Sequence, residues 1–174
     1  NLLCVAMLMP ASQLLEKLAM RVIPDAREPE KNVRLDERLL ATPPLALAQC
    51  EKQASSMAEE AVTALEEGLQ AFETYTPALA EEIRRREDKT DRAEDRLGNY
   101  LIRLSAQPLS QADSEEAAKL LKVIGDFERI ADHAVNLLDS AEELRDKQLA
   151  FSEAARRELS VLTAAVREVL QLAL

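Results

Sequence analysis

Residues 126–138, DFERIADHAVNLL, predict a long helix that carries acidic side chains where its core-facing side should be apolar. At helical spacing the apolar stripe runs through Leu121, Ile124, Ala131, Val135 and Leu138. Glu128 lies four residues after Ile124 and four before Asp132, so both carboxylates fall on this stripe or at its edge. Burying an ionised carboxylate is costly unless it is paired, hydrogen-bonded or bound to a metal. We therefore expect the functional site to lie in this segment.

A second predicted helix, over residues 76–105, carries a matching interruption. Between its two apolar ends, the positions expected to face the core hold Glu87, Thr90 or Asp91, and Glu94. Glu87 and Asp91 are four residues apart, like Glu128 and Asp132. If the two helices are antiparallel neighbours, the two pairs face each other. Four carboxylates on adjacent helices suit a hard cation, so Glu87, Asp91, Glu128 and Asp132 are the candidate metal ligands.

Salt bridges are the competing interpretation of these acidic pairs. The chain holds 32 Asp and Glu residues, so pairs at this spacing also arise by chance. Several arginines lie close enough in the sequence to neutralise them: Arg84, Arg85, Arg86, Arg92, Arg96 and Arg129.

Composition favours helices and argues against several classes of function. The 174 residues are 47% hydrophobic and 31% charged, with 3 Gly, and this usage is typical of long helices. The formal net charge of -10 argues against nucleic acid as a partner. Cys4 and Cys50 have no metal-ligand spacing, and His133 is the single histidine. With no phosphate-binding loop, nucleophile elbow or zinc motif, we expect no enzyme and no catalytic residue.

The beginning of the chain is open to two interpretations. Residues 1–23 are either a helix that docks on the core or the end of a transmembrane segment. In the second case Lys17 and Arg21 form the positive flank that places the remainder in the cytoplasm. Residues 24–43 are charged and interrupted by prolines, which predicts a linker. Within it, Leu35, Leu39 and Leu40 are expected to pack as a short helix.

The remainder predicts an all-α fold, an antiparallel bundle of long helices. Residues 44–148 form a three-helix unit, with helix starts at Pro43 or Pro44, at Thr76 and Pro77, and between Ser110 and Ser114. Ser152 is expected to cap a fourth helix whose apolar stripe is Leu159, Leu162, Val166, Val169 and Ala173. Residues 149–174 are therefore either the first helix of a second, truncated repeat or the fourth member of the bundle.

The acidic motifs resemble those of a known family. DFERIADHAVN, at 126–136, resembles the signature of PhoU-like domains, and EDKTDRAEDRLGNYLIRLS, at 87–105, looks like the family's other acidic pair. LDERLLATPPLALAQCEKQASSMA, at 35–58, resembles the entry to this domain at the C-terminal end of bacterial sodium/phosphate cotransporter-family proteins. LLCVAMLMPASQLLEKLAMRVIP, at 2–24, fits the end of their last hydrophobic segment, and FSEAARRELSVLTAAVREVL, at 151–170, the start of a next repeat.

The resemblance implies a regulatory helical bundle on the cytoplasmic face of the inner membrane. It further implies coupling to phosphate transport and an attached transporter membrane domain as partner. Some members bind multinuclear iron or zinc at the paired motifs, which here correspond to Glu87, Asp91, Glu128 and Asp132. Only one full set of motifs is present, so the site could instead be completed by a second chain in a homo-oligomer. A free-standing PhoU-like regulator of phosphate uptake, or a structural module without a ligand, would carry the same helical pattern.

Overall fold

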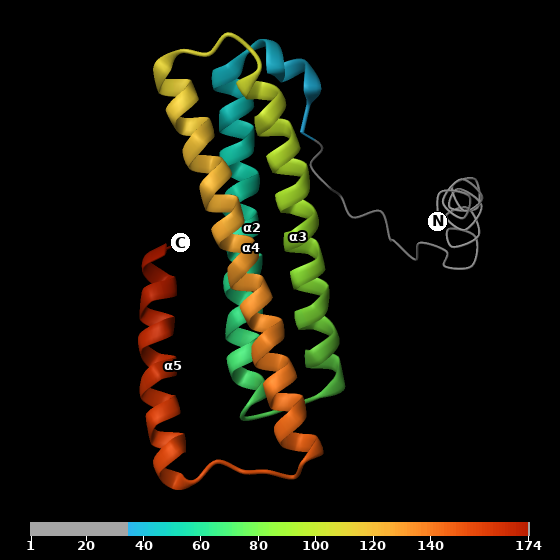
Figure 1. Ribbon diagram of the computed structural model, residues 1–174, viewed down its shortest axis with the longest axis vertical. Coiled ribbons are helices and arrows are strands. Elements are labelled where there is room, and N and C mark those ends of the chain that lie inside the picture. The colour runs from blue at the N-terminus through green and yellow to red at the C-terminus, as the bar shows by residue number, and fades with distance from the viewer. Residues whose placement is uncertain (1–34, 174) are drawn as a thin grey trace, which may run out of the picture. The chain divides into compact units, whose positions relative to one another are not determined.

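The computed structural model describes residues 35–173, which form four α-helices and one short 3-10 helix without any strand (Figure 1). The predicted all-α fold is therefore confirmed for this part of the chain. No helix among the described residues is long and apolar enough to cross a membrane. The two interpretations of residues 1–23 fall outside the described residues, as does most of the predicted linker.

The helices begin and end close to the predicted boundaries. The 3-10 helix η1 is followed by α2, α3, α4 and α5, with bounds Glu37–Ala41, Pro43–Ala71, Pro77–Ser105, Gln111–Asp146 and Glu153–Ala173. Three hydroxyl side chains cap the starts of α3, α4 and α5. The hydroxyls of Thr76 and Ser110 accept hydrogen bonds from the amides three residues on, at 3.1 Å each, and Ser152 does the same at 3.2 Å. These caps satisfy amides that have no partner inside the helix.

Helices α2, α3 and α4 all pack on one another, and α3 runs antiparallel to the other two (Figure 1). Their core consists of two clusters of buried side chains, one near each end. The cluster beside η1 contains Leu97, Leu101, Leu104, Leu120 and Ile124, with residues of α2. The other contains Ile83, Ala134 and Leu138, also with residues of α2. The buried face of α2 is rich in alanine, which lets its backbone approach the neighbouring helices closely.

The segment that enters the bundle is fixed at Asp36. Its amide donates to the Gln49 side-chain oxygen of α2 at 3.0 Å, and its carbonyl accepts from the Tyr100 hydroxyl of α3 at 2.9 Å. Its carboxylate caps η1 by accepting from the Arg38 amide at 3.0 Å. As expected, Leu35 and Leu39 next to this residue pack against the core.

Helix α5 lies outside the common core of the other three. It contacts α2, and among its described side chains only Leu170 is buried. The predicted stripe of α5 is wrong at Leu162 and Val169, which are 61% and 65% exposed. The less exposed positions follow a face rotated from the predicted one: Leu159, Thr163, Val166 and Leu170. Since α5 has apolar residues on more than one side, periodicity alone does not determine which side packs on α2.

Candidate carboxylate site

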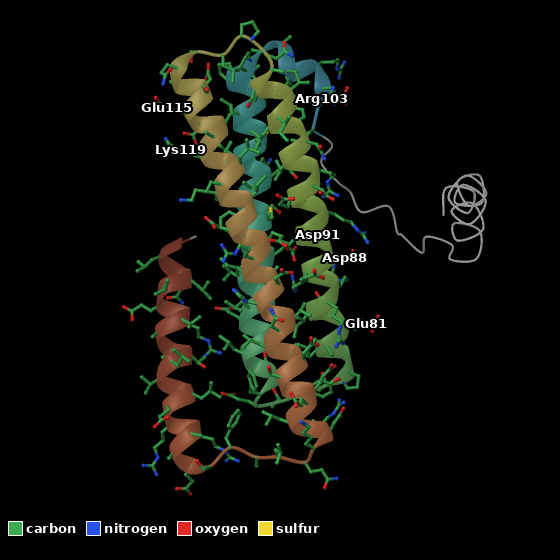
Figure 2. The ribbon with its side chains drawn as sticks, viewed as in Figure 1. Glu81, Asp88, Asp91, Arg103, Glu115 and Lys119 are labelled. Atoms are coloured by element: carbon green, nitrogen blue, oxygen red, sulfur yellow. The ribbon has the colours of Figure 1, made fainter. Side chains whose placement is uncertain are left out.

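The four candidate ligands come from the middle of two antiparallel neighbours. Glu87 and Asp91 lie on α3, and Glu128 and Asp132 lie on α4. Asp91 lies near the centre of α3, with Arg103 towards one end (Figure 2). Glu87 and Glu128 are half-buried, whereas Asp91 and Asp132 are exposed. The site is therefore an acidic patch that runs from the helix interface to the surface.

The two pairs are close enough to repel each other across the interface. Burial is the largest cause that raises the pKa of Glu87, followed by the charges of Asp132, Asp91, Asp88 and Glu128. Three of those carboxylates belong to the predicted set, and two of them come from the other helix. The structure thus brings the pair on α3 within electrostatic range of the pair on α4.

The pKa of Glu128 on α4 is raised in the same way, and here Glu94 contributes in addition to the predicted ligands. Burial raises its pKa most, and the charges of Asp132, Glu94 and Asp91 raise it further, while Arg129 acts in the opposite direction. Glu94 is half-buried on α3 and is absent from the predicted ligands. The polar interruption of the α3 stripe already indicates it, because Glu94 follows the same row as Glu87 and Asp91.

Four of the six arginines near the site bind other carboxylates, whereas Arg96 and Arg129 form no ion pair within residues 35–173. Arg86 pairs with Glu60 at 2.6 Å and with Glu67 at 3.0 Å, and both of these residues belong to α2. Arg84 pairs with Glu142 at 2.7 Å, and the other two pairs are Arg85 with Glu82 and Arg92 with Asp88. Within residues 35–173, no ion pair or side-chain hydrogen bond is made by Glu87, Asp91, Glu128 or Asp132. Salt bridges among described residues therefore do not account for the candidate site.

Thr90 is buried on α3, next to Asp91 in the sequence. It is 1% exposed and is the one polar side chain buried among the described residues. Its hydroxyl donates to the Arg86 carbonyl one turn earlier at 2.9 Å, so burial leaves no unsatisfied polar atom there. The sequence leaves open whether Thr90 or Asp91 faces the core, and in the structure it is Thr90. Asp91 is turned towards solvent beside it.

The donor chemistry fits a hard cation, although no set of ligands is assembled. All candidate groups are carboxylate oxygens, the ligands that hard cations prefer, and they lack neutralising partners in the described part of the chain. Among residues 35–173, no three Asp, Glu, His or Cys side chains are grouped so that they could hold a metal ion. His133 is exposed on the helix surface and is not part of the patch. A cation would therefore have to draw flexible side chains together.

A three-helix bundle with an acidic patch across α3 and α4 belongs to the class of all-α bundle domains. The chain is a member of the PhoU domain family, whose model matches residues 54–141. That match begins within α2, includes all of α3 and ends near the C-terminus of α4. No curated protein and no solved structure matches the chain significantly. Membership of the PhoU family indicates a role in regulating phosphate transport.

Proposed function

We propose that this chain is the cytosolic PhoU-like regulatory domain of a sodium-dependent phosphate cotransporter-family membrane protein. The PhoU match over residues 54–141 supports the regulatory role. The sequence before and after that match supports the attachment to a transporter. In this proposal residues 1–23 end a membrane segment, residues 24–43 link it to the bundle, residues 44–148 are the PhoU-like repeat, and residues 149–174 begin a second one.

The carboxylate site is the sensor in this proposal, and iron or zinc is the cation. Four carboxylates without an ion-pair partner in residues 35–173 lie on the two helices that would have to move together when a cation binds. Binding removes the repulsion between Glu87 and the charges of α4, and so favours a closer arrangement of α3 and α4. A cation can bias the transporter only if it binds two states of the domain with different affinities. The proposed sensor role rests on one observation. Within residues 35–173, no arginine pairs with any of the four carboxylates.

Metal analysis of the purified chain tests the sensor. Protein prepared without chelator and without an affinity-tag metal should retain iron or zinc in a stoichiometric amount. The double variant Glu128→Gln, Asp132→Asn should lose it. A matched control, Glu81→Gln with Glu158→Gln, removes two exposed carboxylates elsewhere and should keep it. Equal metal content in both double variants would reject the site.

Phosphate uptake tests the attachment and the direction of regulation. The complete gene product should carry membrane spans before Asn1 and should give sodium-dependent uptake of labelled phosphate in cells without their own uptake system. The Glu128→Gln, Asp132→Asn variant should change the uptake rate without changing the amount of protein in the membrane. A complete gene product that starts near Asn1 without spans would instead identify a free-standing regulator acting on partner proteins.

A further inference from the structure

The connection between α4 and α5 lies at the end of the bundle far from η1 (Figure 1). A cleft lies next to this connection. The end of α2 and the turn after it form one wall of the cleft, and the end of α4 forms another. The connector and the first turns of α5 close the third side. The volume of the cleft is about 590 Å³, within the range of small-molecule sites. Nine of its fifteen lining residues follow residue 141, where the PhoU match ends.

Aromatic rings give the cleft an apolar lining. The ring centroids of Phe72 and Phe151 are 6.0 Å apart, and the two planes are tilted by 55°. Tyr75 lines the same cleft, and its hydroxyl is held by the Glu142 carboxylate at 3.0 Å. All three rings are only half-buried, so part of each is open to a ligand. An aromatic or otherwise planar body would stack well on this surface.

Two arginines from different elements line the cleft. The Arg145 guanidinium lies 4.2 Å from the centre of the Tyr75 ring. It also pairs with Asp146, but both of these side chains are about half-exposed or more, so the pair is weak and can be exchanged. Arg156 forms no ion pair and no side-chain hydrogen bond with any other residue in 35–173. Glu73 is the one carboxylate among the lining residues, while Glu142 and Asp146 adjoin the cleft as partners of Tyr75 and Arg145.

Arg156 is one of four arginines, with Arg96, Arg129 and Arg167, that form no ion pair within residues 35–173, and it is the one of the four that lines the cleft. Acidic side chains are abundant, and Arg84, Arg86 and Arg92 of α3 all pair with them. Guanidinium groups bind carboxylate, sulfonate and phosphate groups through two parallel hydrogen bonds. Thr163 adds a hydroxyl one to two turns beyond Arg156 on α5, in the same wall. The cleft thus combines an apolar body with an anion-binding edge.

We propose that this cleft binds a small organic anion that joins an aromatic ring to an acidic oxygen group. The ring lies against Phe72, Phe151 and Tyr75, and the acidic group is held by Arg156 with Arg145. Such a ligand would bridge the end of the PhoU repeat and α5, and would fix their mutual arrangement. This site is separate from the carboxylate site and does not depend on the proposed metal.

Two fluorescent probes that differ in the acidic group test the proposal. The anion 8-anilinonaphthalene-1-sulfonate should bind the complete chain at one saturable site, and neutral N-phenyl-1-naphthylamine should bind more weakly. Arg156→Gln should weaken binding of the sulfonate about tenfold, the loss expected for one charged hydrogen-bonding partner. Binding of the neutral probe should not change in this variant.

Arg157→Gln is the matched control, because Arg157 is the next residue of α5, is 80% exposed and pairs with Glu153 instead of lining the cleft. It should leave the binding of both probes unchanged. Phe151→Ala should weaken both probes, and the melting curve of each variant establishes that the bundle is folded. Equal affinity for the two probes, or unchanged sulfonate binding in folded Arg156→Gln, would overturn the proposal.

Discussion

Gly68 of α2 lies directly against the backbone of Ala134 on α4. A Cβ atom added at Gly68 would lie 2.9 Å from the Ala134 carbonyl oxygen and 3.3 Å from its Cα. Both of these are backbone atoms, so neither can turn away as the end of a flexible side chain can. The two helices are therefore in contact at this point without any side chain between them, and any larger residue at position 68 would push them apart.

Gly68→Ala should lower the free energy of unfolding by about 1–3 kcal/mol, the cost of overpacking a close contact. Gly125→Ala is the control, because a Cβ at residue 125 meets nothing within 4 Å. Alanine is the better helix former, so Gly125→Ala should raise stability by roughly 0.5–1 kcal/mol. Denaturant unfolding measures both changes. An increase in stability for both variants would mean that α2 and α4 are further apart in solution than in this structure.

Neutralising Glu87 should stabilise the metal-free domain at neutral pH. Burial and the surrounding carboxylates raise its folded-state pKa above the ordinary value of 4.5. A raised carboxyl pKa means that the charged form is less stable in the folded state than in the unfolded state, so stability falls as pH rises through this window. Glu87→Gln should therefore raise the free energy of unfolding by about 0.5 kcal/mol at pH 7, a typical size for a half-exposed position.

The advantage of Glu87→Gln should disappear as pH falls below the ordinary carboxyl pKa of 4.5, because the wild-type carboxyl is then protonated in both states. Melting curves in chelator-treated buffers between neutral and acidic pH measure this. Glu81→Gln, which removes an exposed carboxylate on the same helix, should show no comparable pH dependence. A loss of stability in Glu87→Gln at neutral pH would indicate that this carboxylate has an attractive partner.

Arg86 connects α3 to two glutamates of α2, and its removal should be costly. Arg86, Glu60 and Glu67 each have 20% of the side chain exposed, so the pairs are only partly screened by water. Arg86→Gln should lower the free energy of unfolding by about 1–3 kcal/mol, because two half-buried carboxylates lose a charged donor. Arg92→Gln removes a more exposed pair with Asp88 and should cost at most about 1 kcal/mol.

Acid titration of the Arg86→Gln variant gives a second measurement. Burial raises the pKa of Glu60, but hydrogen bonds from Lys89 and Arg86 outweigh it and leave the pKa below 4.5. A lowered carboxyl pKa contributes stability that is present above the unfolded value and is lost as pH falls through the folded one. The variant should therefore lose less stability than the wild type on acidification below pH 4.5. An identical acid response in both proteins would contradict this network of ion pairs.

Gln148 ends α4 in a left-handed conformation, with a φ of 54°. Its amide bonds to the Arg145 carbonyl at 3.0 Å, and the Leu149 amide bonds to the Leu144 carbonyl at 2.8 Å, a helix-terminating arrangement that normally favours glycine. Gln148→Gly should raise stability by about 1 kcal/mol, since a residue with a Cβ is strained there. Gln148→Ala, which keeps the Cβ, should give no such gain in the same thermal unfolding assay.

The helices are predictable from the sequence because their signals are local. Thr76 with Pro77, Ser110 and Ser152 are capping residues whose effect depends on a few neighbouring amides, and each begins a helix as expected. Apolar residues of α2 recur at helical spacing, and Cys50 and Met57 among them are buried. Cys50 lies deep enough that burial, followed by the charge of Glu51, raises the pKa of its thiol to about 11.

Features that depend on the packing of separate helices are less predictable. The sequence points to the acidic positions, but it leaves open which carboxylates the arginines bind. Arg86 reaches α2 at Glu60 and Glu67, 26 and 19 residues earlier in the chain, and spacing along one helix cannot indicate that choice. Periodicity places Leu162 and Val169 on the wrong side of α5, because only a neighbouring helix decides which apolar side packs.

The attachment of Asp36 to two helices makes it a mechanical anchor. Its amide is held by Gln49 of α2 and its carbonyl by Tyr100 of α3, on opposite sides of a single residue. A displacement of this residue relative to the bundle acts on one hydrogen bond to α2 and on another to α3. Motion that reaches residue 36 from the preceding segment is therefore delivered to α3, the helix that carries Glu87 and Asp91.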